Sequence, residues 1–214
     1  MTDNKIAIGI VGCGNIAETY LEQITNYNNV HLVGLTDIVS ERAQELAAIY
    51  NCAVYPDLET MVADEKIDLV VNLTIHHVHA EIIEQILQAN KHVYTEKPLA
   101  MNYKDAKCLV DLAEKKNLRL SSAPITYMGE AQQTAAQQIA AGILGQIRLV
   151  YAEINHDRIE TWHPNPIPFF DVGVLWDVGI YALTVCTALM GSVKRVTGYG
   201  KVIAPTRRTL DGES

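Results

Sequence analysis

Short apolar stretches alternate with helical patterns along the first 122 residues. The stretch 5–11 is almost continuously apolar and ends at a glycine, as buried strands of parallel sheets do. The segment 15–26 then places apolar residues at helical spacing, and the alternation continues with short connections. Strands are expected at 5–11, 30–36, 52–55, 68–73, 93–95 and 119–121, and helices at 15–26, 40–50, 57–63, 77–90 and 103–116, with Ser40 as a cap. This rhythm predicts an α/β fold with a doubly wound parallel sheet and helices on both faces.

The alternation stops near Ser122. We expect a helix at 130–141, a long strand at 147–154, a proline-rich loop at 161–168, a helix at about 175–190 and a last strand at 193–203. The sequence therefore predicts two domains, 1–122 and 123–214. The second is expected to be an incomplete α+β domain.

The first strand runs into the sequence Gly-Cys-Gly-Asn-Ile-Ala at 12–17, which is a G-x-G-x-x-A pattern. Gly12 permits the tight turn, Gly14 lets the backbone approach a pyrophosphate, and Ala17 keeps the helix close to the strand. The helix N-terminus offers N–H groups and a positive dipole end to the phosphates. The pattern predicts a Rossmann dinucleotide-binding domain, with Gly12, Gly14, Asn15 and Ile16 at the pyrophosphate.

Asp37 follows the second strand, where dinucleotide-binding domains of this kind carry an acid. Its carboxylate would accept hydrogen bonds from the adenine-ribose hydroxyls, which favours NAD. Arg42 would instead meet the 2′-phosphate of NADP. The choice between NAD and NADP stays open, with NAD favoured. A purely structural alternative also stays open, in which the glycines only make a turn and Asp37 caps a helix.

Composition excludes several classes of partner. A net charge of −8 argues against nucleic acid and against anionic membrane surfaces. The four cysteines lie far apart and form no C-x-x-C pair, which suits reduced thiols in a cytosolic protein. The N-terminus has no signal-peptide pattern, and no uninterrupted apolar run reaches transmembrane length. We expect a cytoplasmic protein.

Two further motifs carry a resemblance to a known family. The segment 92–100, His-Val-Tyr-Thr-Glu-Lys-Pro-Leu-Ala, contains E-K-P after the fifth expected strand. The segment Asp-Val-Gly-Ile-Tyr at 177–181 matches D-x-G-x-[HY]. With the glycine pattern, these motifs make the chain resemble the glucose–fructose oxidoreductase, inositol dehydrogenase and rhizopine-catabolism family over essentially its whole length.

The resemblance implies an NAD(P)-dependent oxidation or reduction at a carbinol carbon of a sugar or cyclitol, held between two domains. By this resemblance Lys97 hydrogen-bonds the reacting hydroxyl and Glu96 helps to fix the nicotinamide ribose. Tyr181 is the proton-transfer partner, and Asp177 holds substrate or Lys97. The resemblance also implies a cofactor-lining loop at Thr74, a cis Lys97–Pro98 bond, and a homo-oligomer, dimeric or tetrameric in a full-length chain, that associates through the second domain's sheet.

Elementary chemistry agrees with these roles. Loss of hydride from a carbinol requires its O–H proton to leave, so an acid–base group must touch that oxygen. Asp177 and Tyr181 are four residues apart, which places them on one face of a helix. Each of these residues also has a purely structural alternative: a surface lysine for Lys97, a core tyrosine for Tyr181 and a structural hydrogen-bonder for Asp177.

Weaker patterns suggest substrate contacts and argue against a metal. Trp162 and His163 lie in a proline-stiffened loop, where they would stack on and hydrogen-bond a sugar, and Tyr127 would line the same cleft. The alternative for this loop is a structural role. Histidines at 76, 77 and 79 match no standard zinc spacing, so we expect no metal.

Two departures from the family are visible. Ile75 and His76 stand where members often carry proline and asparagine, and the chain is much shorter than family members, so we interpret it as a truncated molecule. The main alternative function is a non-catalytic dinucleotide-binding sensor of the same fold. A third alternative is a chain that binds the cofactor but is inert.

Overall fold

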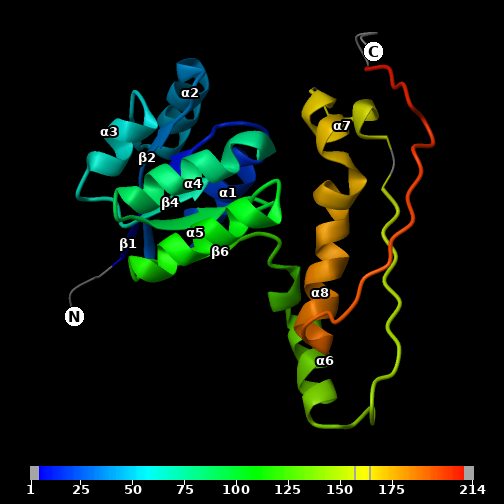
Figure 1. Ribbon diagram of the computed structural model, residues 1–214. Helices are drawn as coiled ribbons and strands as arrows, with labels where there is room; N and C mark the ends of the chain where they lie inside the picture. Colours follow the sequence, from blue (N-terminus) through cyan, green and yellow to red (C-terminus); the bar gives the residue numbers. More distant parts are fainter. Residues whose placement is uncertain (1–4, 157, 164, 210–214) are drawn as a thin grey trace. The chain divides into compact units, whose positions relative to one another are not determined.

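The computed structural model describes residues 5–156, 158–163 and 165–209 and divides into two compact units, Met1–Ala123 and Pro124–Ser214 (Figure 1). Each unit is built differently. The first is a sheet covered by helices, and the second contains helices and long extended stretches (Figure 1).

The first unit is organised by a six-stranded sheet in which every pairing is parallel. Its strands are β1 (Ile6–Val11), β2 (Val30–Thr36), β3 (Ala53–Val54), β4 (Leu69–Asn72), β5 (His92–Thr95) and β6 (Leu120–Ser122). The spatial order is β3-β2-β1-β4-β5-β6. The chain therefore reverses its direction of winding between β1 and β4, where doubly wound sheets bind ligands. The predicted doubly wound parallel sheet is confirmed.

Helices cover both faces of this sheet and form two separate cores. They are α1 (Ala17–Ile24), α2 (Ser40–Tyr50), α3 (Leu58–Ala63), α4 (His79–Gln88) and α5 (Tyr103–Lys115), with a 3-10 turn η1 (His76–Val78) before α4. One core joins α1 and α2 to the sheet through Leu21 and Ala47. The other joins α3, α4 and α5 to the opposite face through Met61, Ile86 and Leu109.

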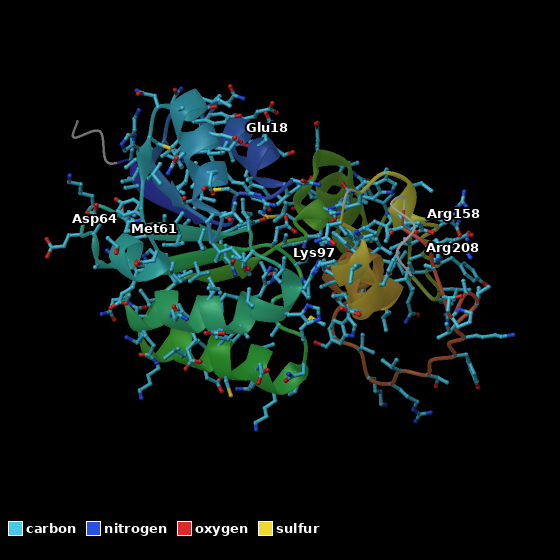
Figure 2. The ribbon with its side chains drawn as sticks, turned by 90° about the horizontal axis from the view of Figure 1, so that it is seen from above. Glu18, Met61, Asp64, Lys97, Arg158 and Arg208 are labelled. Atoms are coloured by element: carbon cyan, nitrogen blue, oxygen red, sulfur yellow. The ribbon has the colours of Figure 1, made fainter. Side chains whose placement is uncertain are left out.

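Close packing at β1 explains one glycine in the sheet. A side chain at Gly9 would lie 2.8 Å from the sulfur of Met61, which is fully buried. Met61, labelled in Figure 2, therefore occupies the space beside β1 that a side chain at this strand position would fill. This contact brings α3 close to the centre of the sheet.

Side-chain caps begin two of the helices, but not the one expected. Asp57 accepts a 2.7 Å hydrogen bond from the Thr60 amide at the start of α3, and Asn102 accepts one of 2.9 Å from the Asp105 amide at α5. The expectation that Ser40 caps α2 is wrong. Ser40 is the first helical residue, and the capping position is taken by Val39, whose amide donates to Asp37.

The second unit is helical where it is regular. It contains η2 (Thr126–Met128), α6 (Glu130–Ala140), η3 (Ile159–Thr161), α7 (Ile167–Val174), the π-helical turn η4 (Leu175–Gly179) and α8 (Ile180–Met190). The expected strands at 147–154 and 193–203 are wrong, because neither range contains a strand in the structure. Apolar alternation alone does not hold such segments in a ladder, since a two-stranded pair without further strands is barely stable in water. The expected α+β character of this unit is not observed among the described residues.

The longest helical stretch starts earlier than expected, at Ile167 instead of 175. Gly173, at φ 76° and ψ 160°, interrupts the regular helix inside it. From Ile167 to Met190 the stretch has 24 residues and is long and apolar enough to cross a membrane. Asp171 and Asp177 interrupt the stretch, so it qualifies by length and mean composition and not as an uninterrupted apolar run. A core helix of a soluble protein has the same length and composition, so this feature is weak evidence for a membrane span.

The buried helix α4 provides a test of the core. Ile86 is fully buried, whereas Ile49 on α2 is 68% exposed. We expect Ile86→Ala to lower the free energy of unfolding by about 2–5 kcal/mol, because it removes buried methylenes and leaves a cavity. Ile49→Ala should change it by less than about 0.5 kcal/mol. Urea unfolding followed by circular dichroism measures both, and equal losses would contradict the assigned core.

Candidate functional site

The turn between β1 and α1 requires glycine at its first position. Gly12 has φ +96°, a conformation that side chains rarely adopt, and its amide donates a 2.9 Å hydrogen bond to the Thr36 carbonyl. A Cβ at Gly12 would lie 2.7 Å from the Leu73 carbonyl and 2.8 Å from the Thr74 nitrogen. The turn therefore packs directly against the chain leaving β4.

The second glycine faces open space. An added Cβ at Gly14 meets nothing within 4 Å, and Gly14, Asn15 and Ile16 are exposed. No side chain caps the N-terminus of α1, whose cap position is Ile16. An open backbone surface beside an uncapped helix N-terminus is the donor set that phosphate oxygens need. These residues therefore fit a dinucleotide pyrophosphate.

Asp37 follows β2 and is bound to the same turn. One carboxylate oxygen accepts a 2.6 Å hydrogen bond from the Cys13 amide, and the other accepts one of 2.7 Å from the Val39 amide. Asp37 thus links the glycine turn to the start of α2. Each carboxylate oxygen has a second acceptor site, so these bonds leave capacity for ribose hydroxyls.

The Cys13 thiol lies inside this turn. Its sulfur is 3.8 Å from the Thr36 carbonyl oxygen, and the side chain is buried. Burial, and then the nearby Asp37 carboxylate, raise the pKa of the thiol to about 12. At neutral pH Cys13 is a small apolar residue in the wall of the site.

The loop after β5 carries the E-K-P motif. The Lys97–Pro98 peptide bond is cis, as the family resemblance implies, and Lys97 is half-buried. One oxygen of Glu96 accepts a 3.1 Å hydrogen bond from the Lys97 amide. The other accepts a 2.5 Å hydrogen bond from the Tyr20 hydroxyl on α1. Lys97, labelled in Figure 2, follows the carboxyl end of β5 in the first unit.

His79 fixes the same loop from α4. This buried imidazole has Nδ1 2.7 Å from the Pro98 carbonyl oxygen and Nε2 2.9 Å from the Thr74 carbonyl oxygen. It thereby ties the loop after β4 to the loop after β5. Both ring nitrogens face carbonyl oxygens, so His79 is not arranged as a metal ligand. No group of three or more His, Cys, Asp or Glu placed to hold a metal occurs among the described residues.

A buried polar pair lies beneath these loops. Asn72 accepts hydrogen bonds from the Thr74 amide and hydroxyl, at 3.1 and 2.7 Å. Asn72 on β4 is in register with Thr95 on β5. Among the described residues, no partner satisfies the Asn72 Nδ2 or the Thr95 hydroxyl, although both are fully buried. Unsatisfied buried polar groups are uncommon and concentrate where ligands or ordered water complete a site.

The first unit therefore brings together the cofactor residues expected from sequence. The glycine turn, Asp37, Thr74 and the E-K-P loop all lie at the carboxyl edge of β1, β2, β4 and β5. The residues expected to face substrate lie in the second unit, with the exception of Lys97. They are Tyr127, Trp162, His163, Asp177 and Tyr181.

Within the second unit, Asp177 is buried and Tyr181 is half-buried. Asp177 lies in the π-helical turn η4, so the α-helical spacing used to place it on one face with Tyr181 is not the local geometry. π-helical turns occur frequently at functional sites. Trp162 is exposed, and its ring lies 5.6 Å from that of His163, which in turn lies 4.7 Å from the Phe169 ring.

Three residues of the site were not identified from sequence as site residues. Tyr20 has the spacing of a core residue on α1, His79 was considered only as a metal ligand, and Asn72 lies within an apolar strand. A polar group in an otherwise apolar pattern was the available signal, because buried polar groups require partners.

These features define a dinucleotide-binding domain of the doubly wound class. The family model described as "Oxidoreductase family, NAD-binding Rossmann fold" matches residues 6–123, and the GFO/IDH/MocA C-terminal domain matches residues 132–212. The chain belongs to the GFO/IDH/MocA oxidoreductase family. The resemblance inferred from its motifs is confirmed.

Individual relatives are similar over most of this chain. An uncharacterised oxidoreductase of Schizosaccharomyces pombe is 32% identical over 181 residues, 83% of this chain and 48% of that protein. A dTDP-3,4-didehydro-2,6-dideoxy-α-D-glucose 3-reductase of Streptomyces violaceoruber is 28% identical over 92% of this chain and 58% of its own length. The chain thus spans about half the length of these curated relatives.

A solved structure shares the fold. The WlbA dehydrogenase of Bordetella pertussis, in complex with NADH and UDP-GlcNAcA, superposes with a TM-score of 0.81. The superposition covers 87% of this chain and 58% of that one, at 23% sequence identity.

The two glycines of the turn should respond differently to the same substitution. Gly12→Ala forces a side chain into the Leu73–Thr74 backbone, so we expect a loss of about 2 kcal/mol or more of stability together with weaker NAD binding. Gly14→Ala meets nothing, so stability should stay within about 0.5 kcal/mol while NAD affinity falls. Thermal unfolding and calorimetry with NAD measure both quantities. An unchanged NAD affinity in Gly14→Ala would argue against pyrophosphate binding at this turn.

Proposed function

We propose that this chain is part of an NAD(P)-dependent oxidoreductase that moves a hydride between nicotinamide and a carbinol carbon of a sugar-like substrate. The observation that carries this proposal is the position of the E-K-P loop. The first unit holds Lys97 at the same sheet edge as the glycine turn. A dinucleotide bound at the turn and a lysine suited to acid–base work therefore share one edge.

The first unit's own residues would bind and orient the dinucleotide. The backbone from Gly14 to Ile16 would donate to the pyrophosphate, and Asp37 would accept from the adenine ribose. Glu96, whose carboxylate is held on both oxygens, would fix the nicotinamide ribose. When bound, the nicotinamide supplies the hydride acceptor or donor.

Lys97 would move the proton that accompanies the hydride. Oxidation of a carbinol releases the hydroxyl proton, and the Lys97 amine would accept it from the reacting oxygen. Tyr181 would be the partner of Lys97 in proton transfer, and Asp177 would bind the substrate or Lys97. The burial of Asp177 in a π-helical turn supports a functional role for that residue.

The proposed substrates are sugars, cyclitols or nucleotide sugars. The activities of similar proteins support this class, since one relative is a reductase of a dTDP-linked sugar. The test is a screen of free sugars, inositols and nucleotide sugars with NAD and NADP, followed by absorbance of the reduced nicotinamide. Dinucleotide binding with no turnover across the screen would favour the non-catalytic sensor.

Lys97→Met tests the acid–base assignment. We expect turnover to fall about 10²-fold or more, with the fold and NAD affinity retained, because an acid–base group typically contributes 10²–10⁴-fold. Lys104→Met, on the exposed side of α5, is the matched control and should leave turnover unchanged. Undiminished turnover in Lys97→Met would remove Lys97 from the mechanism.

Asp37→Asn tests the preference for NAD. It keeps an acceptor for a backbone amide but removes the charge that would repel a 2′-phosphate. We expect the ratio of NADP to NAD affinity to rise by about 10-fold, which corresponds to about 1.4 kcal/mol of electrostatic free energy. Glu41→Gln, an exposed charge on α2, controls for net charge. Calorimetric titration gives both affinities, and an unchanged ratio would count against ribose recognition by Asp37.

Two expectations about the whole protein stay predictions. A full-length chain is predicted to be a homo-oligomer located in the cytoplasm. Light scattering of a full-length protein measures the first, and a monomeric mass would contradict it. Fractionation of cells between membrane and soluble fractions tests the second, with Ile167–Met190 as the segment that would direct a membrane location.

A further inference from the structure

The hydroxyl of Tyr20 joins two parts of the site that are distant in sequence. Tyr20 lies on α1, one turn beyond the glycine turn, and Glu96 lies 76 positions further along, in the E-K-P loop. The two side chains meet at 2.5 Å between the hydroxyl and a carboxylate oxygen. A hydrogen bond to an ionised acceptor is of the short, strong kind, about twice as strong as a neutral one.

The surroundings of Tyr20 make its hydroxyl the donor in this hydrogen bond. The Tyr20 side chain is half-buried, and its ring centroid lies 6.0 Å from that of Tyr94 on β5. Burial, and then the hydrogen bond to Glu96, raise the pKa of the Tyr20 phenol far above its ordinary value. Tyr20 therefore keeps its proton throughout the neutral range and acts as a donor to the carboxylate.

Glu96 connects the Tyr20 hydroxyl to the backbone of Lys97. The second oxygen of Glu96 accepts from the Lys97 amide at 3.1 Å, and the Glu96 amide donates to the Asn72 carbonyl at 2.9 Å. The carboxylate is thus held by α1 on one side and holds the Lys97 backbone on the other. Without the Tyr20 hydroxyl, one oxygen of Glu96 would lose this hydrogen bond. The Glu96 carboxylate could then rotate away from the Lys97 amide.

We propose that Tyr20 is a positioning residue, which uses Glu96 to hold the Lys97 loop against the helix that binds the dinucleotide. This inference deepens the proposed function and rests on it for the role of Lys97. Tyr20 itself takes no part in the transfer of the hydride or of the substrate's hydroxyl proton. A small misplacement of an acid–base group is enough to slow a reaction substantially.

The test compares Tyr20→Phe with Tyr103→Phe, which removes the hydroxyl of an 80%-exposed tyrosine on α5. We expect Tyr20→Phe to lower kcat by about 10-fold or more and to change KM for the substrate by less than about 3-fold. Tyr103→Phe should have the same kcat and KM as the unmodified protein. In a Glu96→Ala background the effect of Tyr20→Phe should disappear, because the two residues act through one contact. A full effect of Tyr20→Phe in that background would overturn the proposal.

A second readout does not need turnover. Amide hydrogen exchange resolved by NMR should show faster exchange at Lys97 in Tyr20→Phe, by about 10-fold, with the amides of β1 unchanged. Unchanged Lys97 exchange would overturn the positioning role, even if the unmodified enzyme turns over. Faster exchange in a chain that reduces no substrate would support the Tyr20–Glu96 link while the proposed function fails.

Discussion

The close passage of the Gly12 backbone against the chain leaving β4 is the constraint on which the rest of the site depends. A single Cβ at Gly12 would overlap the Leu73 carbonyl. Because β1 lies between β2 and β4, this contact sets how closely the glycine turn approaches the crevice at the switch point. Asp37 then ties the turn to α2, so the proposed pyrophosphate and ribose contacts belong to one hydrogen-bonded unit.

The E-K-P loop is held from both faces of the sheet. Tyr20 reaches Glu96 from α1, and His79 reaches the Pro98 carbonyl from α4. These helices belong to different hydrophobic cores, so the loop is stabilised by two packing units at once. A loop supported by rigid helices on each side can hold a reactive amine with little conformational freedom, which is what acid–base chemistry requires.

The sequence was most informative where local patterns and the fold agree. Continuous apolar strands and the turn at 12–17 predicted the sheet, its helices and the cofactor edge, because parallel sheets with this motif admit few alternatives. The strands expected at 147–154 and 193–203 failed, since strand formation depends on neighbours that alternation does not reveal. The hydrogen bonds of Tyr20 and His79 join distant residues, and no periodicity predicts them.

The Cys13 thiol has a consequence for covalent chemistry at the site. Thiol reagents attack the thiolate, and with a pKa of about 12 only about one Cys13 in 10⁵ is ionised at pH 7. Cys108 lies exposed on α5, away from the glycine turn in sequence and on the opposite face of the sheet from α1. Maleimide or alkylating dyes therefore react with Cys108 before they react with Cys13. A fluorophore can thus be attached to α5 while the dinucleotide contacts stay chemically intact.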